Sequence, residues 1–447
     1  MPSPARIAAL QALSGVAQGR VDLPAALVAA RRPLADPRDR ALTSEIATGT
    51  LRWLRSLDYL IERVSGRPLD GIDADILHIL RLTLYQILHL DRIPASAAVD
   101  DAVDLARHVK RPRATGFVNA VLRRVLRERG RLPLPARPAS AARDEALAYL
   151  GITHSHPEWL VSRWLDRHGL DAAERWVRFN NEVPALTLRA NARRTTRDQL
   201  AAALAAGGVE TIPTPHAPAG LRVVSGNPLS APSDGSFFVQ DEASQLVTLA
   251  VAACPGERVL DLCASPGGKT VAMAGDMNDT GRLVACDVRP RRMRLLRETV
   301  RSSGVSHASL VQVAGAGDLP FAGRFDRVLV DAPCSGLGTI RRDPDIRWRR
   351  REEDLARFAE AQLRLLDRAA GVVRPGGRLV YATCSSEPEE NEGVVDAFLA
   401  KHPSYTICDL RQDGSPLMPF LDAHGRFRTL PFLHGLEAFF AAALTSA

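Results

Sequence analysis

Five short apolar runs in the second half of the chain alternate with segments of helical pattern, and this alternation constrains the fold more than any other feature. The runs cover residues 259–263, 283–287, 309–313, 328–331 and 379–383. Strands that alternate with helices form a largely parallel sheet with helices on both faces. Residues 239–447 are therefore predicted to form a doubly wound, Rossmann-like α/β domain, in which ligands bind at the carboxyl ends of the strands.

The first part of the chain has a helical pattern instead. Apolar residues recur there at spacings of three and four, as in Ile76, Leu77, Ile79, Leu80, Leu82, Leu84, Ile87 and Leu88. This periodicity predicts an all-α domain over residues 1–130. Residues 131–150 are rich in Pro, Ala and Arg and are predicted to be a linker, because proline interrupts helices. In residues 151–238 a helical stretch, an extended segment and a second helix predict a small α/β subdomain.

The composition is that of a folded globular protein. The chain has 447 residues, of which 46% are hydrophobic and 24% charged. No apolar run reaches the roughly 20 residues that span a membrane, and the amino terminus lacks the pattern of a signal peptide. The six cysteines include no Cys-x-x-Cys pair and no histidine spaced to complete a zinc site. We therefore expect a cytoplasmic monomer with no membrane association, no bound metal and no disulfide framework.

The basic residues are concentrated in one place. The formal net charge of +7 favours a polyanionic partner. Residues 110–131 alone carry a net charge of +7, with Glu128 opposed by Lys110, Arg111, Arg113, Arg123, Arg124, Arg127, Arg129 and Arg131. Arginine clusters at 289–301 and 341–351 flank the predicted active-site strands, where the backbone of a nucleic acid would have to pass. A solvated helix face would give the first pattern as well, but its density favours contact between the helical domain and RNA.

The glycine-rich turn at residues 261–270, with the sequence DLCASPGGKT, has two interpretations. Its Gly-Lys-Thr ending resembles a phosphate-binding P-loop, and residues 328–331 resemble the strand that accompanies one. This interpretation predicts an RNA-dependent ATPase. Against it, Cys263 stands where the first glycine should be, and Pro266 removes a backbone donor that a phosphate cradle would use.

The second interpretation of the turn is a nucleoside site. Gly267 and Gly268 let the backbone approach a ligand closely. Asp287 ends the next apolar run, 26 residues after Asp261, near the spacing of about 20 expected for a carboxylate that binds ribose hydroxyls. The turn lacks the Gly-x-Gly-x-x-Gly pattern, so S-adenosylmethionine is favoured over a dinucleotide. The turn alone leaves both interpretations open.

Two cysteines favour the nucleoside-site interpretation of the turn over the P-loop interpretation. Cys334 and Cys384 each follow an apolar run, and Asp331 precedes the first of them. Carbon 5 of cytosine becomes nucleophilic when a thiolate adds to carbon 6, and after methylation a base removes the proton from carbon 5 while the sulfur is expelled. A free thiol has a pKa of about 8.5, so the attacking thiol needs nearby positive charge or hydrogen bonds. Buried structural cysteines and a regulatory disulfide are the alternatives, and two cysteines beside serines favour catalysis.

These segments carry a resemblance to a known family. Residues 261–270, 331–338, 342–348 and 383–385 resemble the signature segments of RNA cytosine-C5 methyltransferases, and the helical amino-terminal region resembles the NusB-like RNA-binding domain of the bacterial members that act on 16S ribosomal RNA. The resemblance implies methyl transfer from S-adenosylmethionine to carbon 5 of a cytosine in 16S rRNA, with the base flipped from its stack. Methylation of tRNA and a non-catalytic RNA-binding role are the alternatives.

The resemblance also implies roles for individual residues. Cys384 is the expected nucleophile, Cys334 is expected to assist breakdown of the adduct, and Asp331 is expected to hydrogen-bond the pyrimidine edge. The expected cofactor-binding residues are Cys263, Ala264, Ser265, Pro266, Gly267, Gly268, Lys269, Asp287 and Asp331. One departure is Gly315, which stands where the family usually has an acidic residue against adenine. We expect the adenine to be held either by Asp318 or by packing alone.

Overall fold

The computed structural model describes residues 2–139, 142–230, 234–413 and 415–447. Its internal contacts divide the chain into two compact units. The first unit consists of Met1–Val183 and Ile340–Glu352, and the second of Pro184–Thr339 and Glu353–Ala447. The predicted limits of the helical domain, linker, subdomain and α/β domain remain a proposal. Within the described residues, no helix has the length and apolar character that crossing a membrane requires.

The first unit is built from helices. They are α1 (Pro4–Ala17), α2 (Leu23–Arg31), α3 (Pro37–Arg52), α4 (Leu54–Ser65), α5 (Ala74–His89), α6 (Ala95–His108), α7 (Thr115–Arg127), α8 (Arg143–Ala148), α9 (Glu158–Asn181) and the short α14 (Ile346–Arg349). Local sequence fixes where several of them begin. The side chains of Ser3, Asp22, Asp36 and Asp73 accept hydrogen bonds from the first backbone N–H groups of α1, α2, α3 and α5, as helix-capping residues do.

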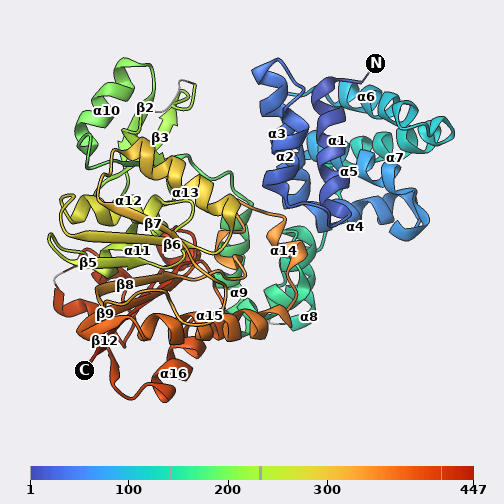
Figure 1. Cartoon of the computed structure of the whole chain (residues 1–447). Helices are drawn as coiled ribbons and strands as arrows, with labels where there is room; N and C mark the ends of the chain where they lie inside the picture. Colours follow the sequence, from blue (N-terminus) through green and yellow to red (C-terminus); the bar gives the residue numbers. More distant parts are fainter. Residues whose placement is uncertain (1, 140–141, 231–233, 414) are drawn as a thin grey trace. The chain divides into compact units, whose positions relative to one another are not determined.

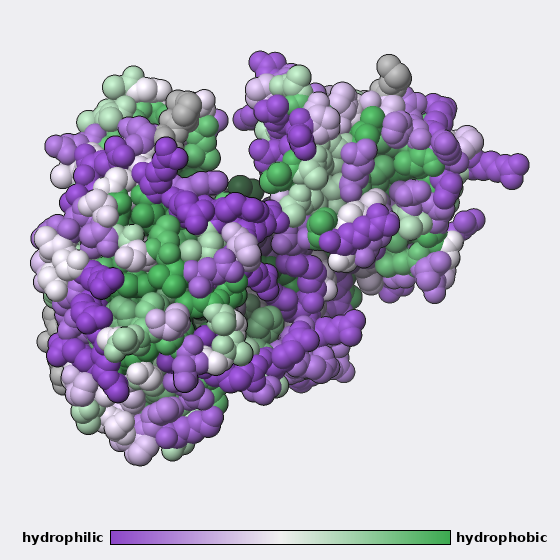
Figure 2. Space-filling view, viewed as in Figure 1, coloured by the Kyte–Doolittle hydropathy of each residue, from purple (hydrophilic) through white to green (hydrophobic). Residues whose placement is uncertain are grey.

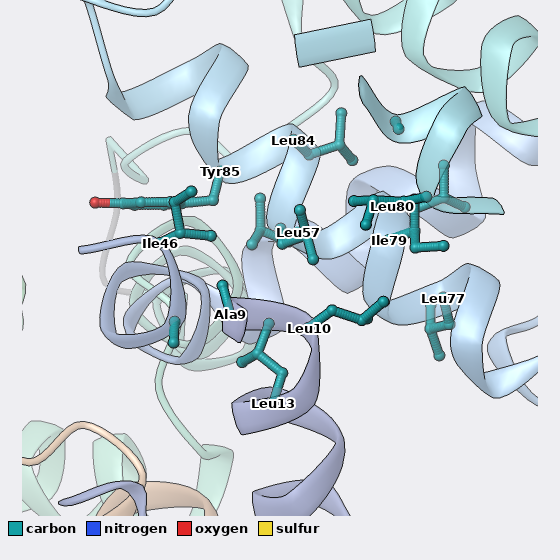
Figure 3. Packing of buried hydrophobic residues seen from close by; sticks show 14 of the residues in the cluster. Ala9, Leu10, Leu13, Ile46, Leu57, Leu77, Ile79, Leu80, Leu84 and Tyr85 are labelled. Carbon is teal, nitrogen blue, oxygen red and sulfur yellow. The ribbon is translucent and has the colours of Figure 1, made fainter. Parts of the chain in front are cut away.

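Helix α5 lies at the centre of the first unit. Its residues Ile79, Leu80 and Leu84 are fully buried, and they are apolar on more than one side, as a helix surrounded by others requires. They belong to the same buried cluster as Leu13 of α1 and Leu57 of α4, and Figure 3 draws these side chains. The predicted helical domain is therefore a bundle packed around α5.

The segment Ile340–Glu352 belongs to the first unit, although the residues on both sides of it belong to the second. Arg347 is fully buried. Its Nη1 donates to the backbone oxygen of Ser155 at 2.9 Å and to Asn181 Oδ1 at 3.1 Å. Trp348 Nε1 donates to the backbone oxygen of Leu51 at 2.7 Å. The expectation that the arginines of 341–351 line a path for RNA is thus wrong for Arg347, which holds this segment in place.

The second unit contains a small sheet with one helix. Its elements are β1 (Thr187–Ala190), α10 (Arg197–Ala206), β2 (Glu210–Pro213), β3 (Gly220–Ser225) and β4 (Phe237–Val239). The strand order is β2-β3-β1-β4, with antiparallel neighbours. Because β3 lies between β1 and β2, the β1-α10-β2 segment forms a split βαβ motif. Thr196 and Gln199 form a capping box that starts α10, which agrees with the predicted extended segment followed by a helix.

The larger sheet of the second unit contains all five predicted strands. Its strands are β5 (Arg258–Asp261), β6 (Arg282–Asp287), β7 (Ala308–Gln312), β8 (Phe325–Asp331), β9 (Val373–Thr383), β10 (Tyr405–Ile407), β11 (Phe427–Arg428) and β12 (Phe440–Ser446). The order is β10-β12-β9-β8-β5-β6-β7, and β11 pairs with β12. Strands β5 to β9 run parallel to their neighbours, whereas β12 is antiparallel to β9.

Helices cover both faces of the larger sheet. They are α11 (Glu242–Val251), α12 (Gly268–Asp276), α13 (Pro290–Ser303), α15 (Asp354–Ala370) and α16 (Glu392–Lys401), with the short α17 (Pro431–His434) near the end of the chain. Figure 1 shows α12 and α13 on one side of the strands and α15 and α16 on the other. Successive residues of a strand point to opposite faces, so Leu260 joins the core beneath α15 and α16, whereas Val259 joins the core beneath α11 and α12.

The predicted fold class is therefore confirmed, with a helical amino-terminal part, a small α/β subdomain and a Rossmann-like domain. Strand β5 has β6 on one side and β8 on the other. The chain order reverses at this point, and in open α/β sheets such a reversal leaves a ligand crevice at the carboxyl ends of the strands.

Candidate active site

The acidic and cysteine residues singled out in the sequence gather at one edge of the larger sheet. Asp261, Asp287 and Asp331 are the last residues of β5, β6 and β8, and Cys384 follows the last residue of β9. In the parallel register Asp261 lies opposite Ala285, and Asp331 lies opposite Ala382. The four strand ends therefore come together, as expected for the carboxyl edge of a parallel sheet.

The two cysteines are in direct contact. Cys334 Sγ lies 3.1 Å from Cys384 Sγ, and both side chains are partly exposed. The hydrogen bond to Cys384 and burial raise the pKa of the Cys334 thiol well above its usual value. Cys334 is therefore the thiol of the pair that keeps its proton, and it can donate that proton to the sulfur of Cys384.

Gly338 fixes the spacing between the two cysteine segments. Its N–H donates to the backbone oxygen of Cys384 at 2.9 Å, and its own oxygen accepts from the N–H of Ala438 at 3.0 Å. A Cβ atom at Gly338 would lie 1.9 Å from the oxygen of Ala438 and 2.8 Å from that of Cys384. No side chain fits in this space, so the chain can approach the Cys384 backbone here only through a glycine.

Lys269 supplies the positive charge at the sheet edge. Its Nζ donates to Asp331 Oδ2 at 2.8 Å and to Ser244 Oγ at 3.1 Å. Burial lowers the pKa of Lys269, but the charge and hydrogen bond of Asp331 outweigh burial and leave the pKa raised, with a further contribution from Cys384. Lys269 is therefore an ammonium held by the Asp331 carboxylate, and its charge interacts with the Cys384 sulfur.

The glycine-rich turn joins β5 to α12 and is held by contacts with neighbouring strands and helices. The N–H of Ala264 donates to the backbone oxygen of Cys286 at 2.8 Å, and Ser265 Oγ donates to that of Arg292 at 3.0 Å. Gly267 precedes α12 with a φ of 111°, a conformation that favours glycine. Pro266 lies between Ser265 and Gly267, and Cys263 is partly exposed, with burial raising the pKa of its thiol.

Arg189 is a residue at this turn that the sequence did not single out. It lies on β1 of the small sheet, is 4% exposed, and donates from Nη1 to the backbone oxygen of Gly268 at 2.7 Å. Its guanidinium also lies over the ring of Phe238. The small sheet thus holds the first turn of α12. The sequence held one signal for this contact. An arginine lay inside a predicted strand, and a charge that is buried there needs a partner.

Asp261 is buried beneath the turn, with 1% of its surface exposed. Burial raises its pKa to about 7, although the hydrogen bond that Oδ2 accepts from Thr270 Oγ1 at 2.7 Å lowers it. Within the described residues, Oδ1 has no hydrogen-bond partner. Asp261 is therefore a carboxyl group that changes protonation near neutral pH at the base of the site.

A cavity of about 510 Å³ lies beside the turn. Its lining includes Cys263, Val288, Pro333, Leu365 and the loop 315–318. A smaller cavity of about 110 Å³ shares Cys263, Val288, Pro333 and Leu365 and is bordered by Asp287. Mostly apolar walls with a few polar groups are typical of small-molecule sites of this size. A carboxylate for hydroxyl groups at one side and apolar walls for a flat base at the other fit a nucleoside.

The loop that contains Gly315 forms one wall of this cavity. Arg368 of α15 holds the loop, because its Nε donates to the backbone oxygen of Gly317 at 2.6 Å and its Nη2 to that of Ala314 at 2.9 Å. Asp318 also lines the cavity and is exposed. The carboxylates in the cavity lining are those of Asp318 and Asp367, and Asp318 lies in the same loop as Gly315.

Comparison with known proteins agrees with this site. A family model described as 16S rRNA methyltransferase RsmB/F matches residues 248–445, the NusB family matches residues 3–127, and a ferredoxin-like domain of RsmF/B-like methyltransferases matches residues 156–230. The fold and the site thus define a methyltransferase with a NusB-like domain.

Relatives that match nearly the whole chain show which family of methyltransferases it belongs to. The chain is 34% identical to the probable ribosomal RNA small subunit methyltransferase B of Bacillus subtilis, over 91% of this chain and 90% of the relative. It is 35% identical to the ribosomal RNA small subunit methyltransferase B of Klebsiella pneumoniae, over 93% of each chain. A solved structure titled PH0851 superposes with a TM-score of 0.80 at 26% identity and covers 99% of both chains. The chain belongs to the RsmB/F family of 16S rRNA methyltransferases, which favours the methyltransferase interpretation of the turn over the ATPase.

Proposed function

We propose that this methyltransferase transfers a methyl group from S-adenosylmethionine to carbon 5 of a cytosine in 16S rRNA through a covalent adduct with Cys384. The observation that carries the proposal is the pair of sulfurs 3.1 Å apart at the edge where the Lys269–Asp331 ion pair also lies. Carbons 5 and 6 are bonded neighbours in the pyrimidine ring, so two touching sulfurs can face both reacting atoms.

The residues around the cavity fit the proposed cofactor. Asp287 offers a carboxylate to ribose hydroxyls, Gly267 lets the backbone come close, and Asp318 lies at the wall where adenine would lie. When bound, S-adenosylmethionine supplies an electrophilic methyl group. The protein's share is to hold the nucleoside portion and to keep water from the reacting edge.

The chemistry on the base follows from the charges at the site. Lys269 stabilises Cys384 as a thiolate, which forms a bond to carbon 6 and turns the ring into a carbon nucleophile at carbon 5. Asp331 hydrogen-bonds the pyrimidine edge and keeps Lys269 in place. After methylation Cys334 gives its thiol proton to the departing Cys384 sulfur and takes up the proton of carbon 5, whose C–H electron pair re-forms the 5,6 double bond as the bond between carbon 6 and sulfur breaks. Cys334 assists this last step.

The proposed RNA contacts lie on exposed arginines. Arg123 and Arg127 of α7 are exposed, whereas Arg124 also donates from Nη1 to the backbone oxygen of Val64 at 3.0 Å. On α13, Figure 2 shows a band of hydrophilic residues, which includes the exposed arginines Arg291, Arg292, Arg294, Arg297 and Arg301. We propose that both surfaces contact phosphates of the rRNA, and that the enzyme acts as a cytoplasmic monomer.

Methylation of purified RNA tests the proposal. The protein would be incubated with S-adenosylmethionine and unmodified 16S rRNA, and the RNA digested to nucleosides for mass spectrometry. We expect 5-methylcytidine in 16S rRNA and none in a parallel reaction with tRNA. Methylation of tRNA alone would favour the alternative substrate, and a methyl group on any other nucleoside or ring position would contradict the proposed chemistry.

A further inference from the structure

We propose that Glu390 is a positioning residue that joins the two cysteine loops and places a negative charge near Cys334. The inference rests on the proposed function and extends it to a residue outside the strand ends. Glu390 lies in the loop after β9 and is fully buried.

The carboxylate of Glu390 binds the residue that follows each cysteine. Oε2 accepts from Ser335 Oγ at 2.5 Å and from Ser385 Oγ at 2.5 Å. Oε1 accepts from the N–H of Ser335 at 2.8 Å. The two serine oxygens are 3.3 Å apart. One carboxylate therefore ties together two loops that are 50 residues apart in the sequence, and the cysteine sulfurs are held in contact as a consequence.

Helix α15 completes this carboxylate site. Gln362 Nε2 donates to Glu390 Oε1 at 2.9 Å and to the backbone oxygen of Pro333 at 3.1 Å. The hydroxyl of Tyr381 lies 2.5 Å from the backbone oxygen of Glu390 and 3.0 Å from Gln362 Oε1. The donors come from three parts of the fold, the loop of Ser335, the loop of Ser385 and α15, so the position of the carboxylate is set by the packed core as well as by its own loop.

The charge of Glu390 acts on Cys334. Four donors surround the carboxylate, and within the described residues no cationic side chain forms an ion pair with it. An ionised carboxylate accepts all four bonds, since it has only acceptor sites. Glu390 is one of the charges that raise the pKa of Cys334, whereas Cys384 interacts with the ammonium of Lys269. Glu390 thus adds negative charge near Cys334, and Lys269 of α12 adds positive charge that interacts with Cys384.

Thiol titration tests this inference without methylation. The variant Glu390→Gln keeps the shape of the side chain and its acceptor at Oε1 but removes the charge. In a Cys384→Ala background, the rate of Cys334 alkylation by iodoacetamide is followed against pH by mass spectrometry of the modified peptide. We expect Glu390→Gln to move the midpoint of this profile to lower pH by about one unit, because a nearby negative charge that opposes thiolate formation is removed.

The control is Glu242→Gln. Glu242 is also buried and accepts from the N–H groups of His216 and Ala217, away from the cysteines. Its variant should leave the Cys334 midpoint unchanged. A Glu390→Gln midpoint equal to that of the parent, in a folded variant, would overturn the electrostatic role whether or not the protein methylates cytosine.

A kinetic measurement tests the positioning role and covers the case in which Glu390→Gln does not fold. Ser385→Ala deletes one of the four hydrogen bonds to Glu390. We expect the kcat of methylation to fall at least fivefold while the KM for S-adenosylmethionine is retained, since the sulfurs lose their alignment and the cofactor cavity does not change. An unchanged kcat would contradict the role of Glu390 in holding the cysteine loops together.

Discussion

Cys334 Sγ lies 3.1 Å from Cys384 Sγ, although the two residues come from separate loops after β8 and β9. Strand pairing brings the loops together, because the N–H of Ala332 donates to the backbone oxygen of Ala382 at 2.8 Å. The contact places one thiol that holds its proton next to a sulfur that interacts with the charge of the Lys269 ammonium. This asymmetry is what a nucleophile and its assisting acid or base require.

Replacing Lys269 with methionine should reduce methylation strongly. The ammonium lies 2.8 Å from Asp331, and its loss removes positive charge next to Cys384. Removing a single preorganised charge or donor from an active site typically lowers kcat on the order of 100-fold. Steady-state kinetics should show this loss in kcat, with a smaller change in the KM for S-adenosylmethionine. A change confined to KM would make Lys269 a cofactor ligand alone.

Replacing Asp261 with asparagine should flatten the pH dependence of stability. The pKa of Asp261 is raised to about 7 by burial, so its neutral form favours the folded state. That contribution is complete below about pH 4 and is lost as the pH rises through 7. The shift corresponds to roughly 4 kcal/mol at most. Urea unfolding measures the free energy of unfolding at pH 5 and at pH 8. This free energy should fall more between the two pH values for the parent protein than for the variant, and equal decreases would contradict the raised pKa.

Replacing Gly338 with alanine should destabilise the second unit. The added Cβ would lie 1.9 Å from the backbone oxygen of Ala438, and overpacking of this kind costs roughly 1–3 kcal/mol or more. The matched control is Gly116→Ala in α7, where a Cβ meets no atom within 4 Å and replacing a helical glycine is neutral or stabilising. Chemical denaturation of both variants measures the difference. Similar stabilities would mean that the Cys384 segment can move away from residue 338.

Replacing both Arg123 and Arg127 with glutamine should weaken RNA binding and its salt dependence. Both side chains are exposed on α7, and removing one arginine–phosphate interaction should reduce the slope of log affinity against log salt by roughly one. Arg107→Gln on α6 is the control, since that side chain is exposed but lies outside the basic cluster. Binding should be measured at several salt concentrations. A changed methylation site with unchanged binding would show that α7 selects the base and does not simply hold the backbone.

The sequence predicted the five parallel strands of the larger sheet, because each is a short apolar run. Four of them, β5, β6, β8 and β9, end at an acidic or hydroxyl residue. It also predicted that Asp331 and Cys384 would lie close together, since the carboxyl ends of neighbouring parallel strands always meet. These predictions need only local patterns and the rule that places ligands at one edge of the sheet. The site residues followed from the fold, and their chemical roles remain proposals.

Other parts of the site depend on contacts between distant residues. Glu390 receives its donors from residues up to 55 positions away, so nothing in its own segment marks it. Arg347 looked like part of a basic surface, but its partners Ser155 and Asn181 are more than 160 residues earlier. Because charged residues are usually exposed, a buried arginine cannot be recognised from the sequence unless its partners are known.

Trapping the covalent adduct tests the central claim most directly. The Cys334→Ala and Cys384→Ala variants would each be incubated with 16S rRNA and S-adenosylmethionine and separated on a denaturing gel. We predict that the Cys334 variant accumulates a protein–RNA adduct, whose protease digestion maps the link to Cys384, and that the Cys384 variant forms no adduct and no 5-methylcytidine. An adduct in the Cys384 variant, or methylation that survives the loss of Cys384, would contradict the account.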